Sequence, residues 1–238
     1  MREVFIYDAL RTPRGKAREG GGLAEIKPQE IIRQIISGLE GRCGDTDVDG
    51  FVLGCVGQFG TQGGNIALVS KLHSGLPDAA PAMTVNNYCV SGLSAIGLAA
   101  SKIAAEEWSN AYAGGIEMMS QAPFLGDRAS YYTDVSFPKR SRFVPVAVAA
   151  DRLANAQGIE RAALDEAALR SQEKAAKAEA NAALNKSRIS VMAANGAVAL
   201  DSDECIRPHT TAEGLADMPP AFAALAEEYA DALGDDRF

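Results

Sequence analysis

The sequence predicts an α/β protein, in which a layered α/β domain is followed by an inserted α+β domain. Over residues 1–120, runs of β-branched and aromatic residues alternate with helical patterns, which is typical of layered strands and helices. The pattern then changes to an aperiodic stretch followed by an alanine-rich, charged region. Hydrophobic residues make up 47% of the 238 residues, which is the composition of an ordinary globular protein.

Four short apolar runs are expected to form the strands of the first domain. The run at 4–7, Val-Phe-Ile-Tyr, is rich in β-formers and predicts a buried first strand. Residues 51–56 predict a second buried strand, and the runs at 82–85 and 111–115 predict two more. Because these runs alternate with helical patterns, we expect a sheet whose strands are mostly parallel.

Three helices are expected between these strands. Pro28 suits the first turn of a helix that runs to about residue 40, with isoleucines at helical spacing. Asn65 can cap a helix that ends at His73. The stretch 91–107 is rich in small residues and predicts a third helix that packs closely on the sheet.

The second half of the chain has a different organisation. Residues 121–145 carry Pro, Gly and Asp without periodicity and predict a long loop. Two helices are expected in 149–183, with a break at 157–159. An Asn-Gly pair within 189–200 predicts a hairpin, and 222–233 predicts a final amphipathic helix.

Cys89 is the strongest candidate for a catalytic residue. It follows an extended run and a polar turn, and it directly precedes the small-residue helix. The positive end of a helix dipole and unpaired backbone N–H groups favour the thiolate, which is the reactive form of cysteine. A buried, inert cysteine is the alternative that the turn by itself leaves open.

Four motifs in order resemble those of the thiolases. The nucleophile motif is Asn-Asn-Tyr-Cys-Val-Ser-Gly-Leu at 86–93. The amino-terminal block Ala-Leu-Arg-Thr-Pro lies within 8–15, and the Gly-Gly-Ile-Glu-Met-Met-Ser block lies within 113–123. Residues 203–222, from Asp-Glu-Cys-Ile-Arg to Pro-Pro-Ala-Phe, are similar to the end of the thiolase loop domain.

This resemblance implies half of the full thiolase fold and an acyl-CoA C-acyltransferase activity. The expected domains are a catalytic domain at 1–120, a loop domain that binds coenzyme A at 121–222 and a helical tail at 223–238. Cys89 would attack an acyl-CoA thioester and form an acyl-enzyme. Coenzyme A and acyl-CoA are then substrates, and no permanently bound cofactor is expected.

The thiolase motifs that supply the acid and base are expected on another chain. The Asn-Ala-Ser-Gly, Asn-Glu-Ala-Phe, Gly-His-Pro and Cys-x-Gly motifs of the family do not occur in these 238 residues. The sequence holds two histidines, of which His73 is expected to cap a helix C-terminus and His209 to lie in a surface turn. A cysteine nucleophile needs a base. We therefore expect a partner chain with the missing half, in a heterotetramer or larger assembly.

Four cationic residues are the candidates for contacts with coenzyme A. Arg207 matches a loop-domain arginine that approaches the adenine-phosphate end of coenzyme A in the family, and an arginine fork suits phosphate. Lys139, Arg140 and Arg142 form the densest basic run in the chain. They can steer coenzyme A or contact a neighbouring subunit, and solvated surface positions are the alternative for all four.

Charge and composition exclude several other functions. A net charge of −8 argues against general nucleic-acid binding. The sequence has no apolar run that approaches a membrane span and no secretory signal, and its four cysteines lack metal-type spacing, so we expect a cytoplasmic protein without a metal. The main alternative to a thiolase subunit is a non-catalytic, thiolase-like scaffold that binds acyl-CoA or stabilises a partner.

Overall fold

The computed structural model describes residues 2–44 and 47–230 and divides the chain into two compact units. Unit 1 comprises residues 1–127 and 182–205, and unit 2 comprises residues 128–181 and 206–238. The boundaries expected from the sequence differ, because residues 182–205 were assigned to the inserted domain. Those boundaries stay a prediction about functional domains, and each unit is described here by itself.

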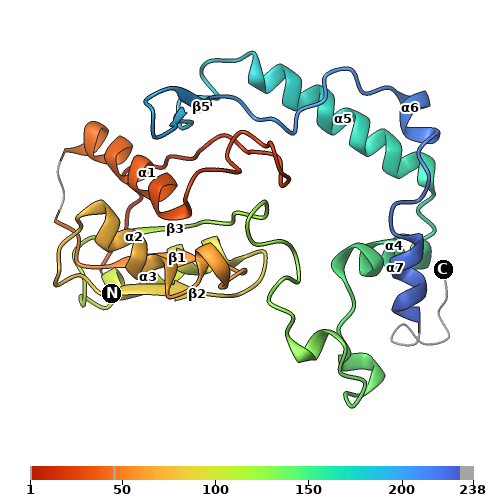
Figure 1. The fold of residues 1–238 in the computed structure, drawn as a ribbon, viewed down its shortest axis with the longest axis horizontal. Helices are drawn as coiled ribbons and strands as arrows, with labels where there is room; N and C mark the ends of the chain where they lie inside the picture. The colour runs from red at the N-terminus through yellow and green to blue at the C-terminus, as the bar shows by residue number, and fades with distance from the viewer. Residues whose placement is uncertain (1, 45–46, 231–238) are drawn as a thin grey trace. The chain divides into compact units, whose positions relative to one another are not determined.

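Unit 1 is built around a three-stranded parallel sheet. Its strands are β1 (Phe51–Gly54), β2 (Ala82–Val85) and β3 (Tyr112–Gly115). The order is β2-β1-β3 (Figure 1). Phe51 lies opposite both Ala82 and Tyr112. These three strands confirm the sequence prediction, and their parallel pairing confirms the expected α/β class.

Helices cover both faces of this sheet. They are α1 (Pro28–Cys43), α2 (Ile66–Ser74) and α3 (Ser91–Ala104). Phe51 and Leu53 belong to a buried cluster with residues of α1 and α2, whereas Val52 packs in a cluster with residues of α3. Because successive side chains of a strand point to opposite faces, α1 and α2 cover one face and α3 covers the other. Helix α3 ends three residues earlier than expected.

The predicted first strand at 4–7 is wrong for this structure. No strand is assigned there, and the exposed fraction rises from 37% at Val4 to 94% at Tyr7. The segment is held at its ends, where the Arg2 amide donates to the Ala104 carbonyl and Asp8 pairs with Arg42. A β-prone run becomes a strand only beside another strand, and none of the described strands pairs with it.

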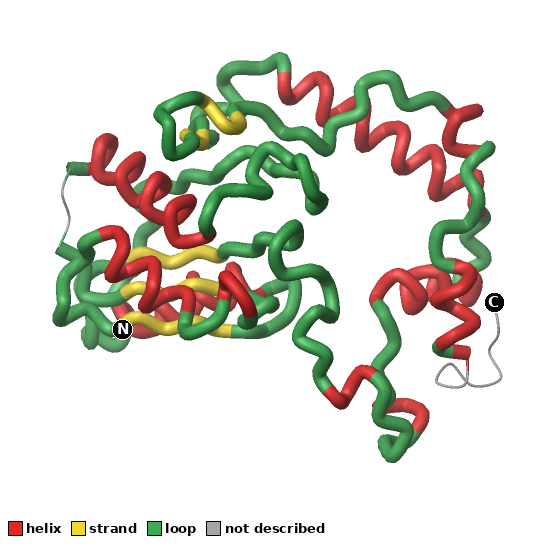
Figure 2. Tube along the Cα trace, viewed as in Figure 1, coloured by secondary structure: helices red, strands yellow, loops and turns green. Residues whose placement is uncertain are grey.

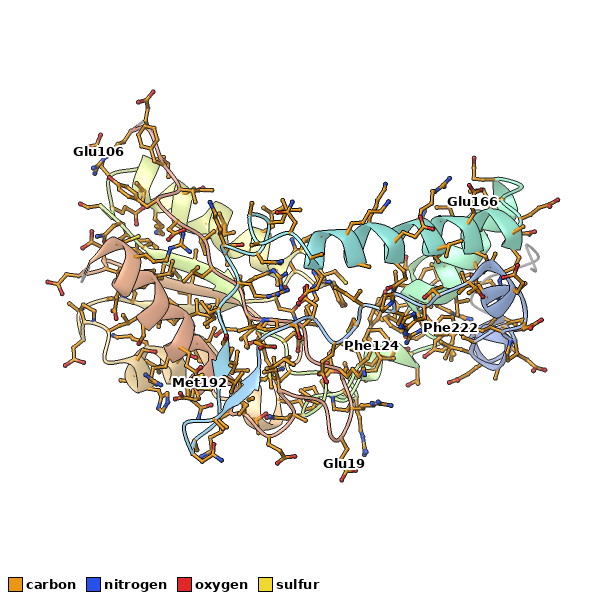
Figure 3. All side chains as sticks on the ribbon, turned by 90° about the horizontal axis from the view of Figure 1, so that it is seen from above. Glu19, Glu106, Phe124, Glu166, Met192 and Phe222 are labelled. Atoms are coloured by element: carbon orange, nitrogen blue, oxygen red, sulfur yellow. The ribbon has the colours of Figure 1, made fainter. Side chains whose placement is uncertain are left out.

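A short hairpin completes unit 1. It pairs β4 (Val191–Met192) with β5 (Val198–Leu200) in antiparallel fashion, as the Asn-Gly pair predicted. The turn uses Gly196 at φ +81°, a conformation that glycine adopts without strain. Val191 is buried in a cluster with Leu23 and Met118. Figure 3 labels Met192 on this hairpin.

Unit 2 consists of helices and loops over its described residues, 128–181 and 206–230 (Figure 2). Its helices are α4 (Val146–Ala156), α5 (Arg161–Glu179), α6 (Ala212–Ala216) and α7 (Ala223–Glu228), with 3₁₀ turns at Ser130–Tyr132 and Lys139–Ser141. The break between α4 and α5 confirms the predicted division. The end of the predicted tail, 231–238, lies outside the described residues.

Side-chain burial in unit 2 is sparse. Helix α5 has no buried residue, and Val148 of α4 is fully buried. An aromatic group forms around Phe143, whose ring lies 4.7 Å from that of Tyr132 and 6.1 Å from that of Tyr229. Over the described part of the chain, no helix is both long and apolar enough to cross a membrane.

Candidate active site

The candidate site lies where the three parallel strands of unit 1 end. The hydrogen bonds between the strands continue to the carboxyl ends of the strands. The Cys55 amide donates to the Val85 carbonyl and the Ile116 amide donates to the Gly54 carbonyl, each at 3.0 Å. The segments 55–58, 86–90 and 116–119 therefore leave the sheet side by side. In open α/β folds, ligands bind at this carboxyl edge.

The turn that carries Cys89 is fixed by side chains on both sides of it. The Asn86 Oδ1 accepts a hydrogen bond from the Tyr88 amide at 3.0 Å. The Ser91 hydroxyl accepts from the Asn87 amide at 2.9 Å and donates to the Tyr88 carbonyl at 2.6 Å. Tyr88 has φ +48°, a left-handed conformation that a non-glycine residue adopts only when its surroundings hold it.

Cys89 itself has the environment expected of an accessible thiol. It is exposed, and α3 begins two residues later, so the cysteine lies just before the positive end of the helix dipole. Cys55 at the end of β1 differs, because burial, with the nearby Glu117 carboxylate, raises its pKa to about 12. Cys55 therefore stays a thiol at neutral pH, as the structural type of cysteine does.

Three glycines let α3 approach the sheet at this edge. A Cβ on Gly54 of β1 would overlap the backbone of Ser91 and Gly92 in the first turn of α3. A Cβ on Gly115 of β3 would lie 3.3 Å from the Gly92 Cα. The start of α3, and with it the Cys89 turn, is thus placed directly on the ends of β1 and β3. The small-residue stretch that contains Gly92 predicted close packing of this helix, whereas no sequence pattern indicated the matching role of Gly54.

Glu117 and Gln62 form a polar cluster beside this edge. The Glu117 Oε2 accepts from the Val56 amide at 2.8 Å, and its Oε1 accepts from the Gln62 Nε2 at 2.8 Å. Gln62 is fully buried; its Nε2 also donates to the Gly57 carbonyl, and its Oε1 accepts from the Met118 amide. The sequence pointed to Glu117 only as part of a motif, and Gln62 gave no signal.

The two histidines take the positions expected from the sequence. His73 lies in the last turn of α2, and its Nε2 is 2.9 Å from the Glu30 Oε2 on α1. Hydrogen bonds from Arg33, and then from His73, lower the pKa of Glu30 to about 2. His209 is exposed in a turn of unit 2. Within residues 2–44 and 47–230, no group of three or more His, Cys, Asp or Glu side chains is arranged to hold a metal.

The four cationic residues all belong to unit 2, whereas Cys89 belongs to unit 1. Arg207 is exposed, and its backbone amide donates to the Gln172 Oε1 of α5 at 2.7 Å. Lys139 and Arg140 are exposed in a 3₁₀ turn. Their contact with coenzyme A stays a prediction.

Arg142 has a structural role within its own loop. Its Nε donates to the Phe137 carbonyl at 3.0 Å, and its Nη2 donates to the Val135 carbonyl at 2.8 Å. A guanidinium that binds two carbonyls in this way fixes the loop's shape. Within the basic run, Arg142 therefore stabilises the loop, whereas Lys139 and Arg140 are exposed on it.

The acidic pair that precedes Arg207 by a few residues braces the amino-terminal segment. Asp203 makes a two-pronged ion pair with Arg11 at 2.8 and 2.9 Å, and these bonds lower the pKa of Asp203 to about 2. The Glu204 Oε2 accepts from the Lys16 and Gly22 amides at 2.8 and 2.9 Å. Asp203 and Glu204 thus contact residues that are 182 to 192 positions away in sequence, and all of these residues belong to unit 1.

Comparisons with known proteins identify relatives of this chain. Among curated relatives, the chain is 33% identical to a β-ketoadipyl-CoA thiolase of Pseudomonas knackmussii, over 92% of this chain and 59% of the relative. It is 35% identical to the enzyme of that name from Pseudomonas putida, with 92% and 60% covered. It is 32% identical to a 3-ketoacyl-CoA thiolase of Bacillus subtilis, with 94% and 60% covered. The chain thus spans about 60% of the length of these relatives.

The family model gives the same result over almost the whole chain. The model of the thiolase N-terminal domain matches residues 4–226, which include the Cys89 turn, the Glu117 cluster and the Asp203–Glu204 brace. The chain therefore belongs to the thiolase family, in the part of it that the N-terminal domain defines.

Proposed function

We propose that Cys89 is the nucleophile of an acyl transfer between acyl-CoA and either coenzyme A or a second acyl-CoA. The observation that carries this proposal is the Cys89 turn, an exposed thiol on a strained, hydrogen-bonded turn directly before α3. Thiolate nucleophiles occur at such electropositive, accessible positions. The thiolase names of the relatives give the substrate class, which is a 3-ketoacyl-CoA.

The reaction has two steps. In the first, the Cys89 sulfur attacks the acyl carbonyl, an acyl–sulfur bond forms, and the leaving group departs with a proton. In the second, coenzyme A or a carbanion attacks the acyl-enzyme, and the Cys89 thiolate leaves. Backbone N–H groups at the start of α3 are suited to stabilise the oxyanion of each step. A base must take the thiol proton in the first step.

That base comes from a partner chain in this proposal. His73 is already paired with Glu30, and neither His73 nor His209 stands in a Gly-His-Pro motif. We propose a heteromer in which a second chain carries the histidine and the second cysteine that the family resemblance implies, assembled as a heterotetramer or larger. Two features of unit 1 support a partner: β3 is an end strand of the sheet, and the β-prone segment Val4–Tyr7 is exposed and pairs with none of the described strands.

The inserted part of the chain is proposed to hold coenzyme A. Arg207, Lys139 and Arg140 are exposed and are suited to the phosphates. Arg142 contributes by shaping the loop through its two carbonyl contacts. This assignment keeps the expected α+β loop domain as a functional region, although its hairpin packs in unit 1.

The first experiment is co-purification from native cells, followed by assays of the eluate with acetoacetyl-CoA, longer 3-ketoacyl-CoA and β-ketoadipyl-CoA. A stoichiometric second chain with Gly-His-Pro and Cys-x-Gly motifs, together with thiolysis that Cys89→Ala abolishes, supports the proposal. Cys43→Ala is the matched control, because Cys43 is also exposed and lies at the end of α1. Loss of activity in both variants would contradict a specific role for Cys89.

A non-catalytic scaffold is the second candidate, and the positions of the two histidines favour it. Alkylation by iodoacetamide separates the two functions. In the enzyme, Cys89 reacts faster than the exposed Cys43 and the buried Cys55 when the partner is present. In a scaffold, Cys89 reacts no faster than Cys43, and the co-purified assembly binds acyl-CoA without turning it over.

A further inference from the structure

Glu117 lies two residues after the end of β3, and its side chain contacts the segment that follows β1. Its carboxylate accepts hydrogen bonds from the amides of Val56 and Gly57, at 2.8 and 3.2 Å, and from the Gln62 side chain at 2.8 Å. Position 57 must be a glycine for this cluster to form, because a Cβ on Gly57 would lie only 2.8 Å from the Glu117 Oε1. The carboxylate therefore fixes the backbone of the segment after β1.

Gln62 gives this carboxylate one orientation. The Gln62 side chain is fully buried, and its amide nitrogen and oxygen are both used, by the Gly57 carbonyl and the Met118 amide as well as by Glu117. If the Gln62 side-chain amide were rotated by 180°, its oxygen would face the Glu117 oxygen, and two acceptors would be in contact. Only a carboxylate at position 117 can accept from all three donors at once, because the amide of glutamine would bring two donor groups together.

The fixed backbone reaches the Cys89 turn through one residue, Val56. Val56 is bonded on both sides: its N–H to Glu117 and its carbonyl to the Asn86 Nδ2 at 3.4 Å. The other end of the Asn86 amide accepts from the Tyr88 amide, and this contact holds Tyr88 in the left-handed conformation directly before Cys89. Each link from Glu117 to Cys89 is thus a hydrogen bond or a chain neighbour.

We propose that Glu117 is a positioning residue for Cys89, acting through Val56 and Asn86 to set the conformation of the turn. The proposal rests on the proposed nucleophilic role of Cys89. Glu117 connects the end of β3 to the segment after β1 by hydrogen bonds, and Asn86 connects that segment to the turn after β2. The ends of the three strands are therefore held together. Cys89 then keeps its place directly before the first turn of α3.

The test is the pH dependence of iodoacetamide alkylation at Cys89, read by peptide mass spectrometry in the co-purified assembly. Exposed Cys205 of the same molecules is the internal reference. Glu117→Gln is expected to lower the Cys89 rate near neutral pH about fivefold or more, the scale of one lost hydrogen bond, and to raise the pH midpoint. Glu166→Gln is the matched control, because Glu166 is an exposed carboxylate on α5 (Figure 3).

The direction of the pH shift separates positioning from direct electrostatics. If Glu117 acts as a nearby negative charge, its removal stabilises the thiolate, and the midpoint falls. A lower midpoint, or an unchanged rate in a folded Glu117→Gln variant, would overturn the proposal. Cys55 also faces Glu117, and its modification is followed in the same digests.

A double-mutant cycle keeps the proposal testable if Glu117→Gln loses stability. Asn86→Ala cuts the relay one step closer to Cys89 and should reproduce the slower alkylation. The double variant should be no slower than the slower single variant, because both changes break one path. Additive losses would show separate effects and overturn the relay. The wild-type rate at Cys89 relative to Cys205 tests the proposed function, whereas the ratio of variant to wild type tests the positioning role.

Discussion

The runs at 4–7 and 51–54 both have the composition of a strand, and only the second of these two is a strand. Phe51–Gly54 lies at the centre of the sheet with a strand on each side, and Val52 is fully buried. Val4–Tyr7 is equally rich in β-formers, yet Tyr7 is 94% exposed. The difference lies in the neighbours of each run, because a ladder needs a second strand on which to form.

The centre of the sheet in unit 1 is covered by helices, whereas its β3 edge and the amino-terminal segment are exposed. At the centre, side chains from α1, α2 and α3 cover both faces of β1. Among the described residues, no strand pairs with the outer edge of β3, and the side chains of the amino-terminal segment Val4–Tyr7 are exposed. Exposed edges and large apolar side chains are features that stable monomers avoid.

The largest loss of stability is expected from a substitution that separates α3 from β1 at the centre of the sheet. Gly54→Ala places a Cβ inside the backbone of the first turn of α3, which cannot yield as a side chain could. We expect a loss of about 3 kcal/mol or more in the free energy of unfolding, measured by urea denaturation. Gly97→Ala is the control: no atom lies within 4 Å of the added Cβ, so this helix position should be unchanged or slightly stabilised. Equal losses in the two variants would refute the close approach of α3 to β1.

The centre of unit 1 could be predicted from the sequence because its signals are local. The β-rich run at 51–54, the Asn65 cap of α2 and the Asn-Gly hairpin turn are each contained in a few consecutive residues. Asn65 indeed accepts from the Leu68 amide at the start of α2. Cys89 was predicted in the same way, from a turn and the helix that follows it.

What the sequence could not predict depends on residues that are far apart along the chain. Gln62 and Glu117 are 55 positions apart, and no pattern in either segment indicates that they meet. The exposure of Val4–Tyr7 is of the same kind, because local composition measures strand propensity and says nothing of the neighbour that a strand requires. The basic run at 139–142 likewise gave no sign that the Arg142 guanidinium binds two carbonyls of its own loop, and the contact of Arg142 with coenzyme A stays a prediction.

A matched pair of valines sharpens the comparison between the two runs. Val52→Ala should cost about 2 kcal/mol in the free energy of unfolding, because it leaves a cavity among Ala95, Ala99 and Trp108. Val4→Ala should change it by no more than about 0.5 kcal/mol, since Val4 is 37% exposed beside no strand. Both values come from urea denaturation of the chain alone. A similar cost at Val4 would mean that the amino-terminal segment is buried in solution, and light scattering would then reveal self-association.

The smallest effect concerns the helices that cover the sheet, and it depends on pH. Glu30 on α1 accepts from Arg33 and His73, which lower its pKa from 4.5 to about 2. A carboxyl whose pKa is lower in the folded state stabilises the fold above its unfolded value, near pH 4.5, and this contribution is lost as the pH falls towards 2. Glu30→Gln should therefore reduce stability by about 1 kcal/mol at pH 7, after allowance for solvent screening, and by almost nothing near pH 2. Thermal melts between pH 2 and 7 measure this difference, with Glu166→Gln as the exposed control. A gap between variant and wild type that stays constant with pH would show that Glu30 contributes by packing and not by its charge.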